Sequence, residues 1–295
     1  MAKRPSSGTI YARREGRPDM FDTFESRLVV KGYIVPETAL RIGVGRAAAV
    51  AGTELPVIRD AHDCPFIPGS SLKGALRSHV EALVRGMATN GADWRCLACD
   101  PTGNEAGQCL SPQRMQTLKE RYEKDDAGLA RAVAAESCLV CQTFGSPWLA
   151  SPVRVRDLPV VDDEWFGQFQ VRDGVAIDRD KGTVAVGPYD YEVVPAGTRF
   201  ELHIVAENLK PWQRGLLWLG LRALGRGDVA LGGFTSRGLG WVRLEQPQVR
   251  LVEGAQALLT LLAGAEAGRV VGDEEARAWI DAFRAELERK GGQDA

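Results

Sequence analysis

The sequence predicts an α+β fold of the ferredoxin-like class, and two observations carry this prediction. Alternating apolar residues mark strands and apolar residues at helical spacing mark helices, in the order strand, helix, strand, strand, helix, strand. That order is the order of the split βαβ motif. Two long insertions, near residues 87–150 and 160–196, interrupt it. Connections of such length in one domain are usually functional or contain structure of their own.

The first strand and the first helix lie in the N-terminal third of the chain. A run of apolar and β-branched residues predicts a strand over residues 26–35. Pro68 marks a turn, and Ser70 or Ser71 is expected to cap a helix that extends to about residue 86.

The same periodicities predict the remaining elements and divide the chain into three parts. In chain order we expect a helix over 112–135, a strand over 151–160, a hairpin excursion over 162–191, a strand over 197–207, an apolar helix over 212–224, a strand from 241 and a charged helix over 277–289. A basic arm at residues 1–25 and a helical tail at 251–295 flank a central fold over residues 26–250.

Composition narrows the class of protein. The chain has 295 residues, of which 44% are hydrophobic and 26% charged, so a disordered or collagen-like protein is excluded. Lys and Arg number 37 against 39 for Asp and Glu, so a nucleic-acid partner would meet a local basic patch. The first twenty residues contain no apolar signal segment, and no apolar run approaches the roughly 20 residues that span a bilayer. We therefore expect a cytoplasmic protein with reduced cysteines and no membrane partner.

Five of the six cysteines lie in one stretch, between Cys96 and Cys141. Cys96 with Cys99, and Cys138 with Cys141, form two C-x-x-C pairs, and two such pairs complete a tetrahedral thiolate site. Cys109 is a fifth candidate ligand, so one of the five cysteines is not needed for a four-coordinate site. The three histidines lie outside this stretch, which favours a structural zinc over an open catalytic zinc. The alternatives are unrelated buried thiols or a redox pair, for which no thioredoxin-like strand precedes either pair.

The glycine-rich segment Gly232–Gly240 is a candidate phosphate site. It matches neither the P-loop nor the dinucleotide fingerprint, because it follows a helix and precedes a strand. Its glycines would let backbone N–H groups approach a phosphate, and Ser236 and Arg237 stand between them. The alternative is a purely structural turn.

A second phosphate-suited segment opens the helix after Pro68. Ser70, Ser71 and Lys73 lie at its N-terminus, where backbone N–H groups attract anions. Lys73 and Arg77 are four residues apart and share one face of the helix. Two such segments in one fold suggest a surface that follows a nucleic-acid backbone.

Four motifs in order give the chain a specific resemblance. The chain resembles the RAMP-superfamily backbone subunits of type III CRISPR effector complexes, and the similarity extends over about residues 26–250. The segments that carry it are Gly52–Asp60 followed by Pro65–Arg77, Cys138–Ser146, Val175–Arg179 with Tyr189–Gly197, and Gly232–Gly240.

The resemblance implies an RRM-like palm that holds CRISPR RNA and target RNA, stacked beside other RAMP subunits. It implies a zinc-binding insertion near residues 87–150 and a β-hairpin thumb near 160–196. The implied zinc ligands are Cys99, Cys109, Cys138 and Cys141, with Cys96 as the alternative to Cys109. The implied RNA-binding residues are Arg46, Ser70, Ser71, Lys73, Arg77, Ser236 and Arg237.

The resemblance also implies a cleavage site. Active members of the family use an aspartate in the loop before P-V-x-x-D for metal-dependent cleavage of target RNA, and this chain has Glu54 there. Its carboxylate could orient a 2′-hydroxyl or hold Mg²⁺ or another divalent cation. The alternatives are a non-catalytic scaffold and a stand-alone processing ribonuclease with His62 or His79 as general base. The cysteine cluster argues against that ribonuclease.

Overall fold

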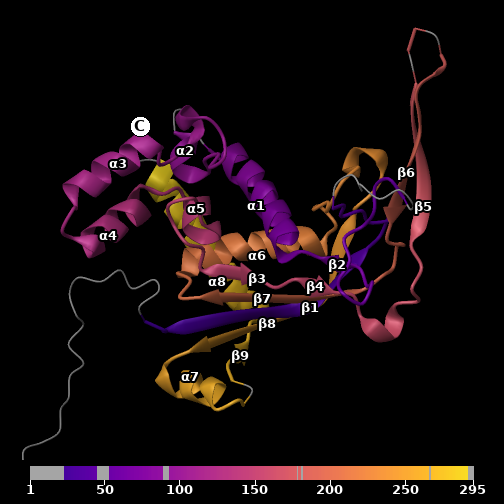
Figure 1. Ribbon diagram of the computed structural model, residues 1–295. Coiled ribbons are helices and arrows are strands. Elements are labelled where there is room, and N and C mark those ends of the chain that lie inside the picture. Colours follow the sequence, from indigo (N-terminus) through magenta and orange to yellow (C-terminus); the bar gives the residue numbers. More distant parts are fainter. Residues whose placement is uncertain are drawn as a thin grey trace, which may run out of the picture.

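A five-stranded antiparallel sheet forms the centre of the molecule, in the order β3–β7–β1–β8–β9 (Figure 1). The computed structural model describes residues 23–44, 53–88, 93–177, 179–180, 182–265 and 267–291. Most of the expected basic arm, and Arg46 among the expected RNA-binding residues, lie outside the described residues. The strands are β1 (Ser26–Pro36), β3 (Val153–Val155), β7 (Phe200–Glu207), β8 (Val242–Glu253) and β9 (Arg269–Val270). The mixed α/β class with an antiparallel sheet is therefore as predicted.

Helices cover one face of this sheet. They are α1 (Gly69–Gly86), α6 (Pro211–Gly225) and α8 (Asp273–Gly291), and α7 (Ala255–Leu262) lies beside β8 and β9 (Figure 1). Burial alternates along β7, because every second side chain faces the helices. Helix α8 approaches α6 closely at Gly215, where a Cβ would lie 2.1 Å from the Trp279 carbonyl oxygen. The segment after residue 250 thus completes the central fold through β9 and α8.

The first insertion differs from its prediction. The single helix expected over 112–135 is wrong: the chain forms α3 (Pro112–Arg121) and α4 (Asp126–Glu136), accompanied by α2 (Trp94–Leu97) and α5 (Leu139–Phe144). The Asp125 side chain accepts a hydrogen bond from the Gly128 N–H and so starts α4 as a new helix. Helical periodicity alone does not reveal this cap, because the charged residues around it suit one long helix equally well.

Two further expectations near α1 are also corrected. Neither Ser70 nor Ser71 caps this helix, because Pro68 is its N-cap and both serines lie within the first turn. Instead, the carboxylate of Asp157 accepts the Gly69 N–H at 2.8 Å. The strand expected over 151–160 is split into β3 and β4 (Leu158–Pro159), and β4 pairs with β2 (Phe66–Ile67).

The second insertion forms a hairpin of its own. Strands β5 (Gln170–Ile177) and β6 (Val184–Val193) pair with each other as a separate two-stranded sheet that projects from the fold (Figure 1). The hairpin excursion expected over 162–191 is therefore present. Among the described residues, no helix combines the length and the apolar character needed to cross a membrane.

Candidate functional site

Four cysteines from three segments of the first insertion meet at one point. Their sulfur atoms all lie within 4.8 Å of one another: Cys99, Cys109, Cys138 and Cys141. Cys99 follows α2, Cys138 is the N-cap of α5, Cys141 lies in α5, and Cys109 precedes α3. Three of the four are buried in the main hydrophobic core. Cys96, the sequence alternative to Cys109, is not a member of this group.

The four sulfurs fit a tetrahedral metal ion. A Zn–S bond of about 2.3 Å at tetrahedral angles sets neighbouring sulfurs roughly 3.8 Å apart. Cys99 Sγ and Cys141 Sγ are 3.5 Å apart, and none of the four exceeds 4.8 Å from another. The four-thiolate donor set is the one that soft and borderline ions such as zinc prefer.

The surroundings of the cluster favour negative charge on sulfur. Two backbone N–H groups, those of Cys99 and Cys141, donate to Cys138 Sγ at 3.4 and 3.3 Å. Burial raises the pKa of Cys138, but hydrogen bonds from the other three cysteines outweigh it and hold that pKa well below its usual value. Hydrogen bonding to Cys109 and then Cys138 raises the pKa of Cys99, because neighbouring thiolates cannot all ionise without a cation.

Arg77 belongs to this cluster in the structure. Its guanidinium donates to Cys141 Sγ at 3.2 Å, to the Gly145 carbonyl oxygen at 2.6 Å and to Glu81 at 2.7 Å. Glu81 in turn is 3.5 Å from Arg85, which donates to the carbonyl oxygen of Cys99 at 2.8 Å. The sequence predicts an RNA-binding role for Arg77 and no role at the cysteines. The bonds to Cys141 and Gly145 instead tie α1 to the cluster, and the bond to Glu81 holds the guanidinium from within the helix.

A second site gathers around the glycine-rich segment. The guanidinium of Arg41 lies 4.9 Å from the centre of the Phe234 ring, and Arg237 lies 4.8 Å from the same ring. Arg237 also donates to the Tyr189 hydroxyl at 2.6 Å, which joins this segment to the base of the hairpin. The Phe234 ring meets Tyr191 edge to face, with centroids 5.0 Å apart. We call these five residues the arginine–aromatic surface.

No pattern in the sequence singles out Arg41, because its burial arises only from the fold. Its residue is 8% exposed, its Nε is buried without a hydrogen-bond partner, and burial lowers its pKa. It borders a cavity of about 530 Å³, whose other walls include Gly43, Leu55 and Gly233. Gly232 approaches so closely that a Cβ there would lie 2.1 Å from the Arg41 carbonyl oxygen. An anion in this cavity would meet the buried Arg41 guanidinium, whose Nε–H has no hydrogen-bond partner among the described residues.

Glu54 lies beside the arginine–aromatic surface. Its backbone N–H donates to the Asp190 carboxylate at 2.8 Å, and its neighbour Leu55 bridges to Tyr191. The Glu192 carboxylate accepts the Val57 N–H at 3.2 Å, and it also binds Arg59 at 2.7 Å and the Thr53 hydroxyl at 3.3 Å. The loop with the candidate carboxylate is therefore fixed to the base of β6, and the Glu54 side chain is exposed.

The other expected RNA-binding residues lie in two places. Ser236 is exposed in the glycine-rich segment beside Arg237, while Ser70 is exposed in the first turn of α1. Ser71 follows in the same turn. Lys73 donates to the Val153 carbonyl oxygen at 2.8 Å, and burial, followed by the charge of Arg77, lowers its pKa. The structure thus gives Lys73 and Arg77 internal partners, whereas Arg237 remains at the surface.

Comparison with known proteins gives consistent matches. A family model described as the RAMP superfamily matches residues 33–243. A protein of Methanocaldococcus jannaschii named CRISPR system Cms endoribonuclease Csm3 is 28% identical over 234 residues, which are 75% of this chain and 79% of that protein. A protein of the same name from Methanothermobacter thermautotrophicus is 25% identical over 260 residues, 77% of this chain and 87% of that protein.

Proposed function

The chain belongs to the RAMP superfamily, and from this premise we propose that it is a CRISPR RNA-binding backbone subunit of a type III antiviral effector complex. The order β3–β7–β1–β8, with α1 and α6 as crossovers, is that of the split βαβ motif and supports an RRM-like palm over residues 26–250. In this proposal the β5–β6 hairpin is the thumb, near residues 160–196. The partners are CRISPR RNA, target RNA and other RAMP subunits, in the cytoplasm.

The arginine–aromatic surface is the observation that carries this proposal. It places a buried arginine, an exposed arginine and three aromatic rings beside a glycine-rich turn. Arginines that meet phosphates fix an RNA strand without reading its sequence, and aromatic rings stack on any base. We assign guide phosphates to Arg41 and Arg237, with Ser236, Ser70, Ser71 and Arg46 as further contacts and Lys73 at the edge of the same track.

Binding of guide RNA to Arg237 variants tests the proposal. Arg237→Ala should weaken binding and lower the salt slope by about 0.7, the value for one phosphate on a single strand. Arg226→Ala is the matched control, because Arg226 is exposed and pairs with Asp228. Unchanged affinity and an unchanged salt slope in Arg237→Ala would refute the assignment.

We further propose that Cys99, Cys109, Cys138 and Cys141 hold one structural zinc ion. The fit of the four sulfurs and the N–H groups aimed at Cys138 support this ligand set. A bound zinc would supply four coordinate bonds that join α2, α5 and the loop before α3. These coordinate bonds would support the face of α1 from which the Arg77 guanidinium contacts Cys141.

We also propose that Glu54 is the carboxylate of target-RNA cleavage. Its backbone is anchored to Asp190 at the base of the thumb, where a kinked duplex would place a target 2′-hydroxyl in line with the next phosphodiester. Mg²⁺ or another divalent cation, held by this carboxylate, would supply charge stabilisation. Glu is one methylene longer than Asp, and this departure favours the second candidate function, a scaffold that holds RNA without cleaving it.

A further inference from the structure

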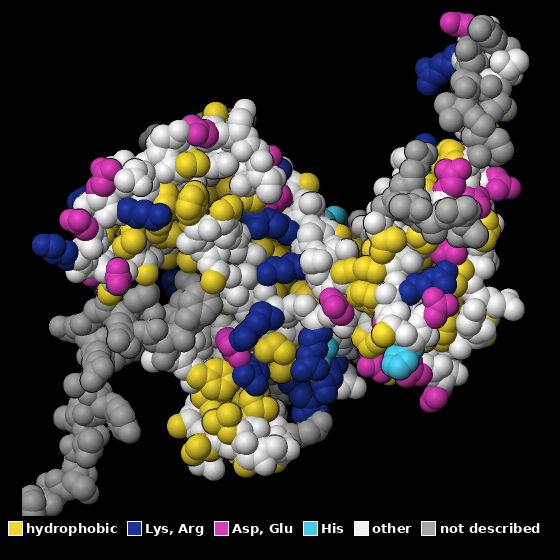
Figure 2. Space-filling model, viewed as in Figure 1, with side chains coloured by type: hydrophobic (Ala, Val, Ile, Leu, Met, Phe, Trp, Pro, Cys, Tyr) yellow, Lys and Arg dark blue, Asp and Glu magenta, His cyan; other side chains and the backbone are white. Residues whose placement is uncertain are grey.

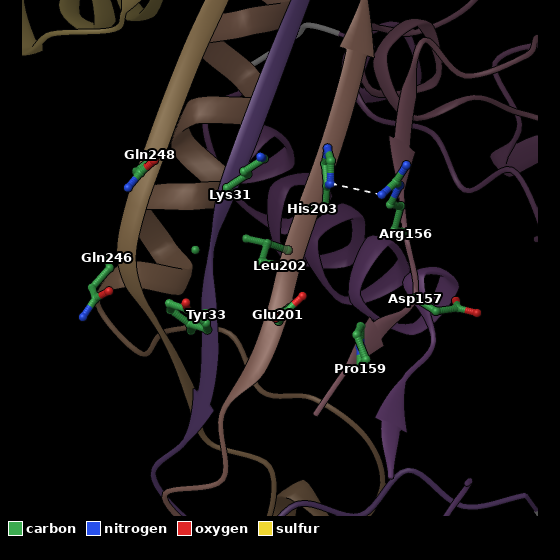
Figure 3. Close-up of a pocket in the computed structure, with 11 residues that line it drawn as sticks. Lys31, Tyr33, Arg156, Asp157, Pro159, Glu201, Leu202, His203, Gln246 and Gln248 are labelled. Atoms are coloured by element: carbon green, nitrogen blue, oxygen red, sulfur yellow. Dashed lines mark hydrogen bonds between the residues drawn. The ribbon is translucent and has the colours of Figure 1, made fainter. Parts of the chain in front are cut away.

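A row of three basic side chains crosses the sheet on the face away from α1 and α6 (Figure 3). His203 in β7 pairs directly with Lys31 in β1, and Lys31 pairs with Gln248 in β8. The Arg156 N–H donates to the His203 carbonyl oxygen at 3.1 Å, which places Arg156 at the other end of the row. Directly paired residues point to the same side of a sheet, so these side chains are neighbours about 5 Å apart.

This basic row has no acidic counterpart within the described part of the chain. No carboxylate there lies within ion-pair distance of Lys31, Arg156 or His203, and Arg156 Nη1 is 3.4 Å from His203 Nδ1. Asp157 lines the same hollow but accepts the Gly69 N–H. Like charges on paired strands repel. A bound anion would remove that repulsion. Figure 2 shows Lys and Arg side chains gathered over the strands beside α7.

The row borders a hollow with the size and chemistry of a nucleotide site. Its volume is about 550 Å³, within the range of small-ligand pockets. Tyr33 lines it, and the Arg199 guanidinium lies 3.9 Å from the centre of the Tyr33 ring in a cation–π contact. Gln246 and Glu201 line the same hollow and can hydrogen-bond to base edges.

We propose that this open sheet face binds a single-stranded RNA segment, with phosphates along Lys31, His203 and Arg156 and a base against Tyr33. The site is separate from the guide surface, since it shares no residue with Arg41, Arg237 or the glycine-rich segment. Stacking on Tyr33 favours RNA over an acidic peptide. The Glu201 carboxylate can in addition accept a hydrogen bond from the amino group of a base.

The histidine ring signals of the full-length protein provide a site-specific test. The chain has three histidines, so the signal of His203 can be assigned with a His203→Gln variant. We expect short oligouridylate to shift the His203 signal. Lys31→Gln combined with Arg156→Gln should weaken binding about tenfold and lower the salt slope by about 1.4, at roughly 0.7 for each phosphate. Lys119→Gln with Arg121→Gln on α3 removes the same charge elsewhere and should change neither quantity.

The outcomes separate this inference from the guide assignment. Oligouridylate that binds through Arg237 but leaves the His203 signal unmoved, and is insensitive to Lys31 and Arg156, overturns the inference and leaves the guide surface intact. A polyglutamate peptide that shifts the His203 signal when RNA does not makes the row a protein-docking surface and also overturns it. RNA binding that changes neither in Arg237→Ala nor in Lys31→Gln with Arg156→Gln overturns both proposals.

Discussion

Replacing Arg77 by methionine separates its two candidate roles. The guanidinium makes hydrogen bonds to Cys141 Sγ, the Gly145 carbonyl oxygen and Glu81, and its side chain is 18% exposed. Methionine keeps the apolar stem and removes all three bonds. Glu81 would retain only the longer contact with Arg85, at 3.5 Å. Removing one partner of a buried pair costs about 3 kcal/mol, so the free energy of unfolding should fall by about that amount.

The same substitution should weaken metal binding. Loss of a group that orients a metal ligand typically lowers metal affinity by about 10- to 100-fold. Urea unfolding and competition with a chromogenic chelator measure the two effects. Lys73→Met is the matched control, because Lys73 lies on the same helix and bonds to Val153 instead of a cysteine. Adding Glu81→Leu to Arg77→Met should recover part of the lost stability, since the unpaired carboxylate is removed as well.

One result would refute this reasoning about Arg77. If Arg77→Met left the urea midpoint and the metal affinity unchanged while RNA affinity fell, the contacts to Cys141 and Glu81 would be incidental. Arg77 would then be a phosphate-binding residue, as its position on the helix face first indicated.

Three further predictions follow from the same structure. Cys141→Ser should give an aggregation-prone chain without zinc, and elemental analysis that finds no zinc in the freshly purified parent protein would contradict the site. Glu54→Asp should cut target RNA faster than the parent in the magnesium-loaded complex and Glu54→Ala should not cut, because a displacement of roughly 1 Å can cost about 100-fold in rate; equal cutting by all three removes Glu54 from the mechanism. Burial, with Arg156 and Lys31, lowers the pKa of His203, so the unfolded chain binds a proton there first and the parent should lose stability as the pH falls below about 6.5. Urea midpoints measured against pH should fall less steeply in His203→Gln, and parallel curves would contradict the assignment.

The parts of the fold that sequence could predict are those set by local patterns. Alternation along residues 197–207 gave β7, and apolar spacing gave α1 and α6 with bounds close to the observed ones. The closely spaced cysteines were likewise identified as one cluster, although only the second C-x-x-C pair, Cys138 with Cys141, presents both sulfurs to it.

The parts that sequence could not predict depend on contacts between distant residues. The side chain that accepts the Gly69 N–H at the start of α1 is Asp157, which is 88 positions away along the chain, whereas the local pattern pointed to the nearby serines. Arg41 is buried against Phe234 only because the glycine-rich segment folds back over it. The role of Arg77 at Cys141 depends on the approach of α5 to α1. No local pattern encodes any of these three contacts.

The contacts of Glu192 have a mechanical consequence. This one carboxylate binds Thr53, Val57 and Arg59, and it belongs to β6 at the foot of the hairpin. The loop that contains Glu54 is thus fixed to the base of the hairpin. A displacement of the base of the hairpin is therefore expected to move the loop that contains Glu54. Under the proposed function, binding of a duplex by the hairpin should therefore also position the Glu54 carboxylate, and shortening the hairpin should uncouple the two.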